Sequence, residues 1–403
     1  MKSLVIVYDG MADRPVPELG GRTPMEVAHT PAMDDLSKNA LVGTVLNVPA
    51  GMVPESDTAN LAILSYDPRV YSRGRSPLEA VSMGLAMSPD DTALRCNLVT
   101  LTEDEPYEEK TILDHSSGEI TTEEARELIL ALDAALGSGT MRFHTGVSYR
   151  HCLLWRGASD SYPFARPHDI LGRRIGAYLP TGDEGRAFLE LQKKSYEILN
   201  HHPVNEARRA RGLHVANSIW LWSPGKKPAL PSFAEKWGKN ATVISAVDLI
   251  KGIARCAGME SIDVPGATGN LHTNYRGKAE AAIDAFRRGQ DMVYVHVEAP
   301  DECGHQGDAA GKVQSIERID REILAPLFLA LGDGGEPFRI LLLPDHPTPI
   351  TLRTHSEEPV PFLLYDSTCP RPGVPHLTEE TARAARLYLP DGTALMGMLF
   401  AQT

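Results

Sequence analysis

LVIVYDG, at residues 4–10, is a short apolar run that ends abruptly at an aspartate. The run shows no alternation of polar and apolar residues, which is typical of a strand covered on both faces, as in a parallel sheet. Three later runs share this character, and we predict that all of them are buried strands of the same parallel sheet. They are MVYVHV (292–297), FRILLL (338–343) and PFLLY (361–365).

Helical patterns lie between the apolar runs. Apolar residues recur at helical spacing at 122–136, 240–258 and 276–289. Strands that alternate with helices predict an α/β fold, with a mostly parallel sheet flanked by helices.

The middle of the chain, residues 92–225, differs from both flanks. It is rich in Pro, His and Arg, and its strand-like runs are less regular. Because the similar strands lie on both sides of it, we predict a smaller α/β domain at 92–225, inserted into a core made of 1–91 and 226–403. The alternative is one large sheet with long excursions.

Length, net charge and cysteine content indicate the number of domains, the kind of partner and the cellular compartment. A length of 403 residues favours two domains. The formal net charge of −13 argues against nucleic acid or an anionic membrane as the main partner. The five cysteines are widely spaced and contain no C-x-x-C, which indicates a reducing compartment. The first apolar run is too short for a signal peptide, and no run has the length of a membrane span, so we expect a soluble, cytoplasmic protein.

Three of the predicted strands run into an aspartate, namely Asp9, Asp301 and Asp345. Side chains that follow the carboxyl ends of parallel strands share one rim of the sheet, where ligands bind. Three carboxylates at one point repel one another unless a cation lies among them. We therefore predict a cation at this rim.

Histidines accompany these carboxylates at His305, His346 and His355. Imidazole together with carboxylate suits Mn²⁺ or Zn²⁺, whereas a set made only of oxygens favours Mg²⁺ or Ca²⁺. Three Asp and three His exceed the needs of one four-coordinate ion. The set fits two metal ions that share a nucleophile.

Ser56 is the candidate nucleophile, in the segment VPESDTANLAIL. A serine just ahead of a helical pattern can be a plain N-cap. The same place also suits catalysis, because the N–H groups at a helix start attract phosphate and a metal lowers the pKa of a bound hydroxyl. Together with the Asp and His residues, Ser56 indicates metal-dependent phosphoryl transfer.

These residues resemble the cofactor-independent phosphoglycerate mutases of the archaeal type, in the alkaline-phosphatase superfamily. The resemblance runs in order along almost the whole chain. The segments that carry it are YDGMADRP, GMVPESDTANLAILSYDP, GRSPLEA, RCNLVTL, DHSSGEIT, HTGVSYRH, PHD, NSIWLWSPG, GATGNLHTNYRGKAEAA, DECGHQGD and PDHPTPITLRTHSEEPVPF.

The resemblance implies a phosphatase-like core with an inserted substrate-binding domain. It also implies two divalent metal ions, with Mn²⁺ as first choice and Zn²⁺ or Mg²⁺ as possible replacements. One ion would be held by Asp301, His305 and His355, and the other by Asp9, Ser56, Asp345 and His346.

The implied reaction interconverts 3-phosphoglycerate and 2-phosphoglycerate, a step of glycolysis and gluconeogenesis, through a phosphoserine at Ser56. His115 and Arg150 of the insert would bind substrate, Lys278 of the core would help bind the phosphate, and Arg150 and Asp169 would take part in catalysis. The plainer interpretations are surface charges for Arg150 and Lys278 and a turn cap for Asp169.

Rival functions remain open at this point. A branch of the same family is proposed to act as a homoserine kinase, although the chain lacks a G-x-x-x-x-G-K-[ST] loop for ATP. A metallohydrolase of phosphate esters and a non-catalytic metal-binding protein are also compatible with the pattern.

The sequence leaves monomer and homodimer equally open. Arg208, Arg209 and Arg211 are predicted to form a solvated helix face rather than a phosphate clamp.

Overall fold

Two compact units make up the chain in the computed structural model, which describes residues 1–401. Unit 1 consists of Met1–Ser72 and the chain from Ala229 onward, and unit 2 is Arg73–Pro228. Unit 2 thus interrupts unit 1 in sequence. It begins earlier than the residue 92 expected from composition, because helix α5 (Arg75–Ser82) packs against strands β3 and β7 of unit 2.

An eight-stranded sheet forms the centre of unit 1. Its three middle strands pair in parallel and are buried along almost their whole length, as their apolar sequences predict. In spatial order the strands are β13 (Tyr388–Leu389), β2 (Ala40–Val45), β12 (Val360–Asp366), β11 (Phe338–Leu343), β1 (Lys2–Tyr8), β10 (Met292–Val297), β8 (Ala241–Ile244) and β9 (Glu260–Ile262).

The direction of β12 departs from the prediction. The run at 361–365 is a strand as expected, but it lies antiparallel to both β11 and β2. The connection between β11 and β12, residues 344–359, contains no helix, and a parallel neighbour usually requires a helical crossover. The other five pairings of the sheet are parallel, so the sheet is mostly parallel as predicted.

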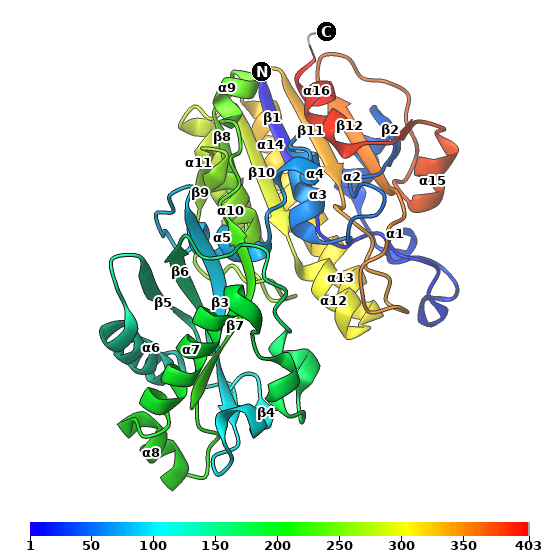
Figure 1. Ribbon diagram of the computed structural model, residues 1–403. Helices are drawn as coiled ribbons and strands as arrows, with labels where there is room; N and C mark the ends of the chain where they lie inside the picture. The colour runs from blue at the N-terminus through cyan, green and yellow to red at the C-terminus, as the bar shows by residue number, and fades with distance from the viewer. Residues whose placement is uncertain (402–403) are drawn as a thin grey trace. The chain divides into compact units, whose positions relative to one another are not determined.

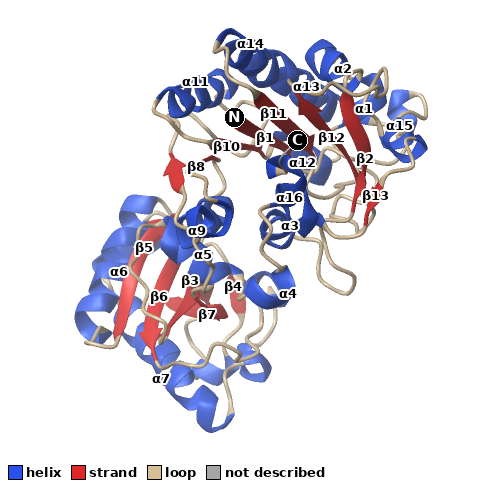
Figure 2. Ribbon diagram, turned by 90° about the horizontal axis from the view of Figure 1, so that it is seen from above, coloured by secondary structure: helices blue, strands red, loops and turns tan. Residues whose placement is uncertain are grey.

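Helices cover both faces of this sheet. Figure 2 shows α11 and α14 on one side of the central strands and α3 and α16 on the other. Apolar side chains of α2, α11, α13 and α14 form one core with Leu4, Ile6 and Tyr8 of β1. The helices of unit 1 are α1 (Pro24–Val27), α2 (Pro31–Ser37), α3 (Ser56–Ile63), α4 (Pro68–Tyr71), α9 (Phe233–Trp237), α10 (Asp248–Cys256), α11 (Tyr275–Arg287), α12 (Ala299–Gln306), α13 (Ala309–Ile319), α14 (Ala325–Asp333), α15 (Glu379–Ala384) and α16 (Leu395–Phe400).

Unit 2 has a sheet of a different kind, in which every pairing is antiparallel (Figure 1). Its core joins the sheet to α6 and α7. The strands are β3 (Asp91–Leu101), β4 (Ile112–Asp114), β5 (Met141–Val147), β6 (Arg150–Arg156) and β7 (Ser218–Lys226), and the remaining helices are α6 (Thr122–Leu136), α7 (Gly182–Leu199) and α8 (Pro203–Ala210).

The predicted α/β class with a second, smaller α/β unit is confirmed. The predicted helices at 122–136 and 276–289 correspond to α6 and α11, whereas the segment 240–258 is not a single helix. It begins with β8 and becomes helical only at α10, since ATVI is a β-branched run that pairs with β10. No described helix combines the length and the apolar character that a bilayer crossing requires.

Candidate active site

The three predicted aspartates meet at one rim of the unit 1 sheet. Asp9 directly follows β1, Asp345 follows β11, and Asp301 lies in the first turn of α12, just beyond β10. Because β11, β1 and β10 are parallel neighbours, their carboxyl ends lie side by side. All three carboxylates are buried, with 1 to 6% of their surface exposed.

Asp301 lies between two of the predicted histidines. His305 Nε2 is 3.3 Å from Asp301 Oδ2, and His355 Nε2 is 3.3 Å from Asp301 Oδ1. The two Nε2 atoms are 2.9 Å apart. The structure therefore brings together the three residues expected to share one metal ion.

The second predicted set also converges. His346 Nε2 lies 3.6 Å from Asp9 Oδ1 and 3.5 Å from Asp345 Oδ2. Ser56 Oγ is 3.2 Å from the same His346 nitrogen. The rings of His346 and His355 stack with centroids 4.0 Å apart, so the two sets are continuous.

Ser56 is the first residue of α3, and it does not cap that helix. Glu55 occupies the N-cap position, and its side chain makes no capping hydrogen bond. The interpretation of Ser56 as a plain N-cap is therefore wrong. Its hydroxyl is left to face His346, at a helix start that attracts anions.

Asp345 is held rigidly by groups around it. Its Oδ1 accepts hydrogen bonds from the backbone N–H groups of Gly10 at 3.1 Å and His346 at 2.9 Å. Its Oδ2 accepts from the Asn60 side chain at 2.9 Å, and the same Asn60 amide donates to the Ser56 carbonyl at 2.8 Å. The carboxylate and the serine are thus fixed by one shared side chain.

Gly10 allows the close approach of these segments. It has φ of +64°, and a Cβ at this position would lie 2.7 Å from both Cα and Oδ1 of Asp301. Any larger residue would have a strained backbone conformation at this φ, and its Cβ would displace the Asp301 carboxylate. The glycine after Asp9 is therefore a requirement of the site.

Sequence reasoning missed two residues of this cluster, His296 and Glu298. His296 Nε2 lies 3.2 Å from Asp9 Oδ2, and both side chains are fully buried. The carboxylate of Glu298 groups with those of Asp9 and Asp301. The available signal was a lone histidine inside the apolar run MVYVHV, since a polar residue in a fully buried strand requires a polar partner.

The electrostatics of the rim favour added positive charge. Burial, together with the charges of Asp345 and Asp301, raises the pKa of Asp9 well above its ordinary range. Burial and the charge of Asp301 raise the pKa of Glu298 to about 7. A hydrogen bond to Asp301 raises the pKa of His305 to about 9, and burial lowers the pKa of His296 to about 4. Crowded carboxylates of this kind are relieved by a cation.

The donor set fits a divalent metal ion. The Nδ1–H of His305 donates to the Arg353 carbonyl at 3.0 Å, and that of His355 donates to the Pro54 carbonyl. Each ring then turns its Nε2 atom toward Asp301 and leaves Nδ1 to the backbone, which is how metal-ligating histidines are usually oriented. Asp9 Oδ1 is buried and has no hydrogen-bond partner within residues 1–401. The described residues therefore contain groups able to hold a metal ion.

The predicted substrate residues of unit 2 lie close to one another. The Arg150 guanidinium lies 5.1 Å from the centre of the Tyr149 ring, and His115 packs against the same ring at 5.7 Å. His115 also contacts His168, whose Nε2 is 3.6 Å from the Asp169 carboxylate. Nδ1 of His115 is buried without a hydrogen-bond partner in the described part of the chain, which is consistent with a ligand group there.

One alternative and one prediction about charged residues are corrected. The plainer interpretation of Lys278 as a surface charge is wrong, because the residue is fully buried and its Nζ donates to the His296 carbonyl at 3.0 Å. Burial lowers its pKa to about 8. Arg208 is not on a solvated helix face either, since only 3% of it is exposed and it pairs with Glu124 of α6. Arg209 and Arg211 pair with Glu103 and Glu124.

A serine hydroxyl beside carboxylates and imidazoles at the rim of a parallel sheet is typical of metal-dependent phosphoryl-transfer enzymes. The sequence pattern of the family described as 2,3-bisphosphoglycerate-independent phosphoglycerate mutase matches residues 37–205. A protein of that name from Methanosarcina barkeri is 47% identical over 99% of both chains. A probable one from Geobacter sulfurreducens is 45% identical over 99% of both. The chain belongs to this family.

Solved structures agree with this assignment. The cofactor-independent phosphoglycerate mutase of Thermoplasma acidophilum is 29% identical, with a TM-score of 0.71 over 99% of each chain. A protein of Pyrococcus horikoshii is 29% identical, with a TM-score of 0.82 over 100% of this chain and 98% of that one. The predicted family is confirmed, and the homoserine kinase alternative gains no support from these relatives.

Proposed function

We propose that this chain interconverts 3-phosphoglycerate and 2-phosphoglycerate by passing the phosphoryl group through Ser56. The observation that carries the proposal is the position of the Ser56 hydroxyl. It makes no capping bond, lies at a helix start and faces the Asp/His cluster at 3.2 Å from His346. A phosphoryl group bound there would meet helix N–H groups on one side and the cluster on the other.

The chemistry conserves all atoms between substrate and product. Ser56 Oγ loses its proton and forms a bond to phosphorus while the bond between phosphorus and the C3 oxygen breaks, and the C3 oxygen takes up a proton. In the second half, the C2 oxygen loses its proton and attacks the phosphoserine, and the released Ser56 Oγ takes up a proton. Asn60 keeps Ser56 and Asp345 in place throughout, because it bonds to both.

Divalent metal ions would be held by the two sets at the rim. Asp301, His305 and His355 form one set, and Asp9, Ser56, Asp345 and His346 form the other. When bound, such ions lower the pKa of the serine hydroxyl and neutralise charge on the phosphoryl oxygens. Mn²⁺ is our first choice, with Zn²⁺ or Mg²⁺ as possible replacements, because the donors mix imidazole and carboxylate.

The glycerate part of the substrate is assigned to unit 2. Arg150 is exposed and has no ion-pair partner in residues 1–401, so its guanidinium is free to bind a carboxylate in bidentate fashion. His115, which packs against the same Tyr149 ring as Arg150, has an unpaired ring nitrogen, and Asp169 lies next to His168. In unit 1, Lys278 is assigned to the phosphate, for which its buried amine would supply positive charge.

A direct test supplies metal-loaded protein with 3-phosphoglycerate, and in parallel with ATP plus homoserine, and identifies products by ³¹P NMR. We expect 2-phosphoglycerate in the first reaction and no phosphohomoserine in the second. The Ser161→Ala variant serves as a control, because Ser161 is an exposed serine outside the cluster. Formation of phosphohomoserine alone would reverse the assignment, and release of inorganic phosphate alone would indicate a hydrolase.

A further inference from the structure

The three histidines predicted to bind metal differ in what holds their Nδ1 atoms. His305 and His355 donate from Nδ1 to backbone carbonyl groups. Nδ1 of His346 instead lies 3.4 Å from the side-chain hydroxyl of Thr348. A backbone carbonyl cannot be removed by mutation, whereas a hydroxyl can, so the role of Thr348 is open to a direct test.

The Thr348 hydroxyl has two partners in the cluster. It donates to Oδ1 of Asp301, and the same oxygen is the one that lies near Nδ1 of His346. An ionised carboxylate only accepts hydrogen bonds, and a hydroxyl has a single proton to donate. Because Thr348 donates that proton to Asp301, it must accept a hydrogen bond from the Nδ1–H of His346. The neutral His346 ring then carries its proton on Nδ1 and none on Nε2.

Nε2 of His346 is the atom that the proposed metal site requires. It lies 3.2 Å from Ser56 Oγ, 3.6 Å from Asp9 Oδ1 and 3.5 Å from Asp345 Oδ2. In the opposite neutral tautomer, an Nε2–H would point into this set of oxygen atoms and would exclude a cation. A metal-ligating histidine must present a nitrogen without a proton.

Thr348 is itself fixed by the segments around it. Its backbone N–H donates to the Ala12 carbonyl at 3.2 Å, and its carbonyl accepts from Lys312 Nζ at 2.8 Å. Gly304 packs so closely that a Cβ there would lie 2.6 Å from the Thr348 carbonyl oxygen. Thr348 is also fully buried, so its side chain has little room to turn away from its two partners.

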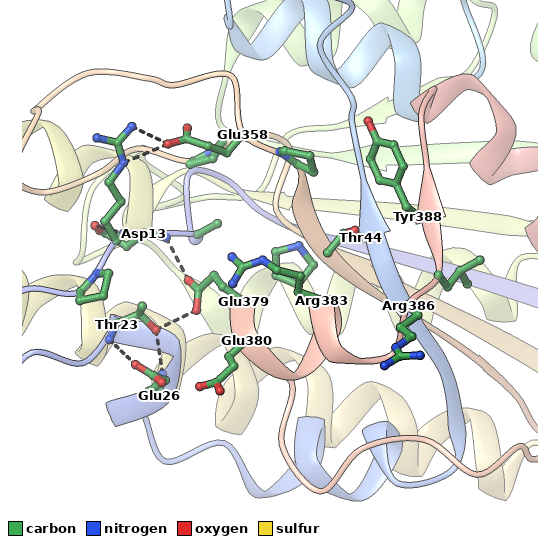
Figure 3. A pocket seen from close by; sticks show the side chains of 17 residues that line it. Asp13, Thr23, Glu26, Thr44, Glu358, Glu379, Glu380, Arg383, Arg386 and Tyr388 are labelled. Carbon is green, nitrogen blue, oxygen red and sulfur yellow. Dashed lines mark hydrogen bonds and ion pairs between the residues drawn. The ribbon is translucent and has the colours of Figure 1, made fainter.

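A buried ion pair supports this arrangement. Lys312 Nζ also bonds to Asp13 Oδ2 at 2.7 Å, and the Asp13 carboxylate accepts from the Ile350 N–H at 3.2 Å. Figure 3 shows the hydrogen bond that the Asp13 backbone N–H donates to Glu379 at 3.0 Å. The loop after β1, the loop after β11 and α13 are thus tied together around Thr348.

We propose that Thr348 is a positioning residue of the metal centre, which fixes both the ring orientation and the tautomer of His346. The inference rests on the proposed function, because it requires a metal ion at Nε2 of His346. Thr348 then serves His346 as the backbone carbonyls serve His305 and His355. Loss of such a partner typically lowers metal affinity by about 10–100-fold.

The test is a calorimetric titration of the metal-free full chain with Mn²⁺, for wild type, Thr348→Val and Thr348→Ser. Valine keeps the shape of threonine without the hydroxyl, and serine keeps the hydroxyl. We expect Thr348→Val to bind Mn²⁺ at least about tenfold more weakly than wild type, and Thr348→Ser to bind it almost as tightly as wild type. Thr348→Ala is a second variant without the hydroxyl and should behave as Thr348→Val does. Wild-type affinity in Thr348→Val would overturn the proposal, as would an equal loss in Thr348→Ser.

A matched control is Thr92→Val in unit 2. Thr92 is also fully buried, and its hydroxyl donates to the Ala158 carbonyl at 2.7 Å, so this variant too loses a buried hydrogen bond. We expect it to bind Mn²⁺ as wild type does, and thermal denaturation of the metal-free proteins checks that each variant folds. An equal loss of affinity in Thr92→Val would overturn the proposal. Absence of Mn²⁺ binding in wild type would instead contradict the metal sites of the proposed function, and the inference with them.

Discussion

The two units of this chain hold their predicted site residues in contrasting ways. In unit 1, Asp9, Asp345 and His346 are each only 1% exposed. In unit 2, Arg150 is exposed and the Asp169 side chain is 62% exposed. The parallel sheet of unit 1 is covered on both faces and gathers polar groups only where its strands end. The contrast indicates a preorganised centre for chemistry in unit 1 and an open recognition surface in unit 2.

Replacing Ser56 should give the largest effect. Ser56→Ala is expected to lower kcat by on the order of 10³-fold or more, since it removes the proposed nucleophile. Thermal stability should stay close to that of wild type, because the Ser56 side chain does not cap α3. The measurement is the rate of 2-phosphoglycerate formation, with Ser161→Ala as control. A variant that retains most of its turnover would remove Ser56 from the mechanism.

Asp301→Asn should have the next largest effect. The amide keeps the size of the carboxylate but removes the charge that lies between His305 and His355. We expect Mn²⁺ affinity, measured by calorimetry, to fall by at least about 100-fold. Asp333→Asn is the control, because Asp333 is exposed at the end of α14. Equal Mn²⁺ affinity in the two variants would show that Asp301 holds no metal ion.

Arg150→Ala should weaken substrate binding and leave metal binding unchanged. We expect KM for 3-phosphoglycerate to rise by about tenfold or more while Mn²⁺ affinity is unchanged, because the substituted residue lies in unit 2. Arg156→Ala is a matched control, since Arg156 is an exposed arginine at the other end of the same strand. A fall in Mn²⁺ affinity in Arg150→Ala would contradict the division of labour between the units.

The smallest expected effect is a change in how the free energy of unfolding depends on pH. It arises from His151 of unit 2. Burial lowers the pKa of His151 to about 4 in the folded chain, against about 6.5 in the unfolded chain. Between these values the unfolded chain binds the extra proton. The neutral His151 therefore stabilises the fold above pH 6.5. This stabilisation is lost as the pH is lowered from 6.5 to 4, by up to about 1.4 kcal/mol per pH unit.

His151→Gln removes this titration and keeps an acceptor for the Gly146 N–H, which lies 3.0 Å from His151 Nδ1. Urea denaturation at several pH values should show a shallower acid dependence for the variant than for wild type. Parallel curves for the two proteins would mean that His151 does not remain neutral in the fold.

The catalytic rim was predictable from sequence because its residues follow directly from strong local patterns. Asp9, Asp301 and Asp345 each come just after an apolar run, and parallel strands bring such positions together. Ser56 was open to two interpretations, and only its tertiary contact with His346 decides between them.

Features that depend on distant contacts could not be predicted. The direction of β12 is not encoded in PFLLY, because an apolar run reads the same for either pairing. Arg208 resembled a surface charge, but its partner Glu124 lies on another helix far away in sequence. His296 is a partial exception, because a lone histidine in a buried apolar strand indicates a polar partner, but only the fold shows that this partner is Asp9.

The most direct test of the central claim follows the phosphoryl group itself. Metal-loaded protein is mixed with 3-phosphoglycerate carrying ³²P, quenched within one turnover and digested, and the labelled peptide is sequenced. We expect label on Ser56 that appears before 2-phosphoglycerate and disappears when unlabelled substrate is added. Label on another residue, or rapid 2-phosphoglycerate formation with no labelled peptide at all, would contradict it.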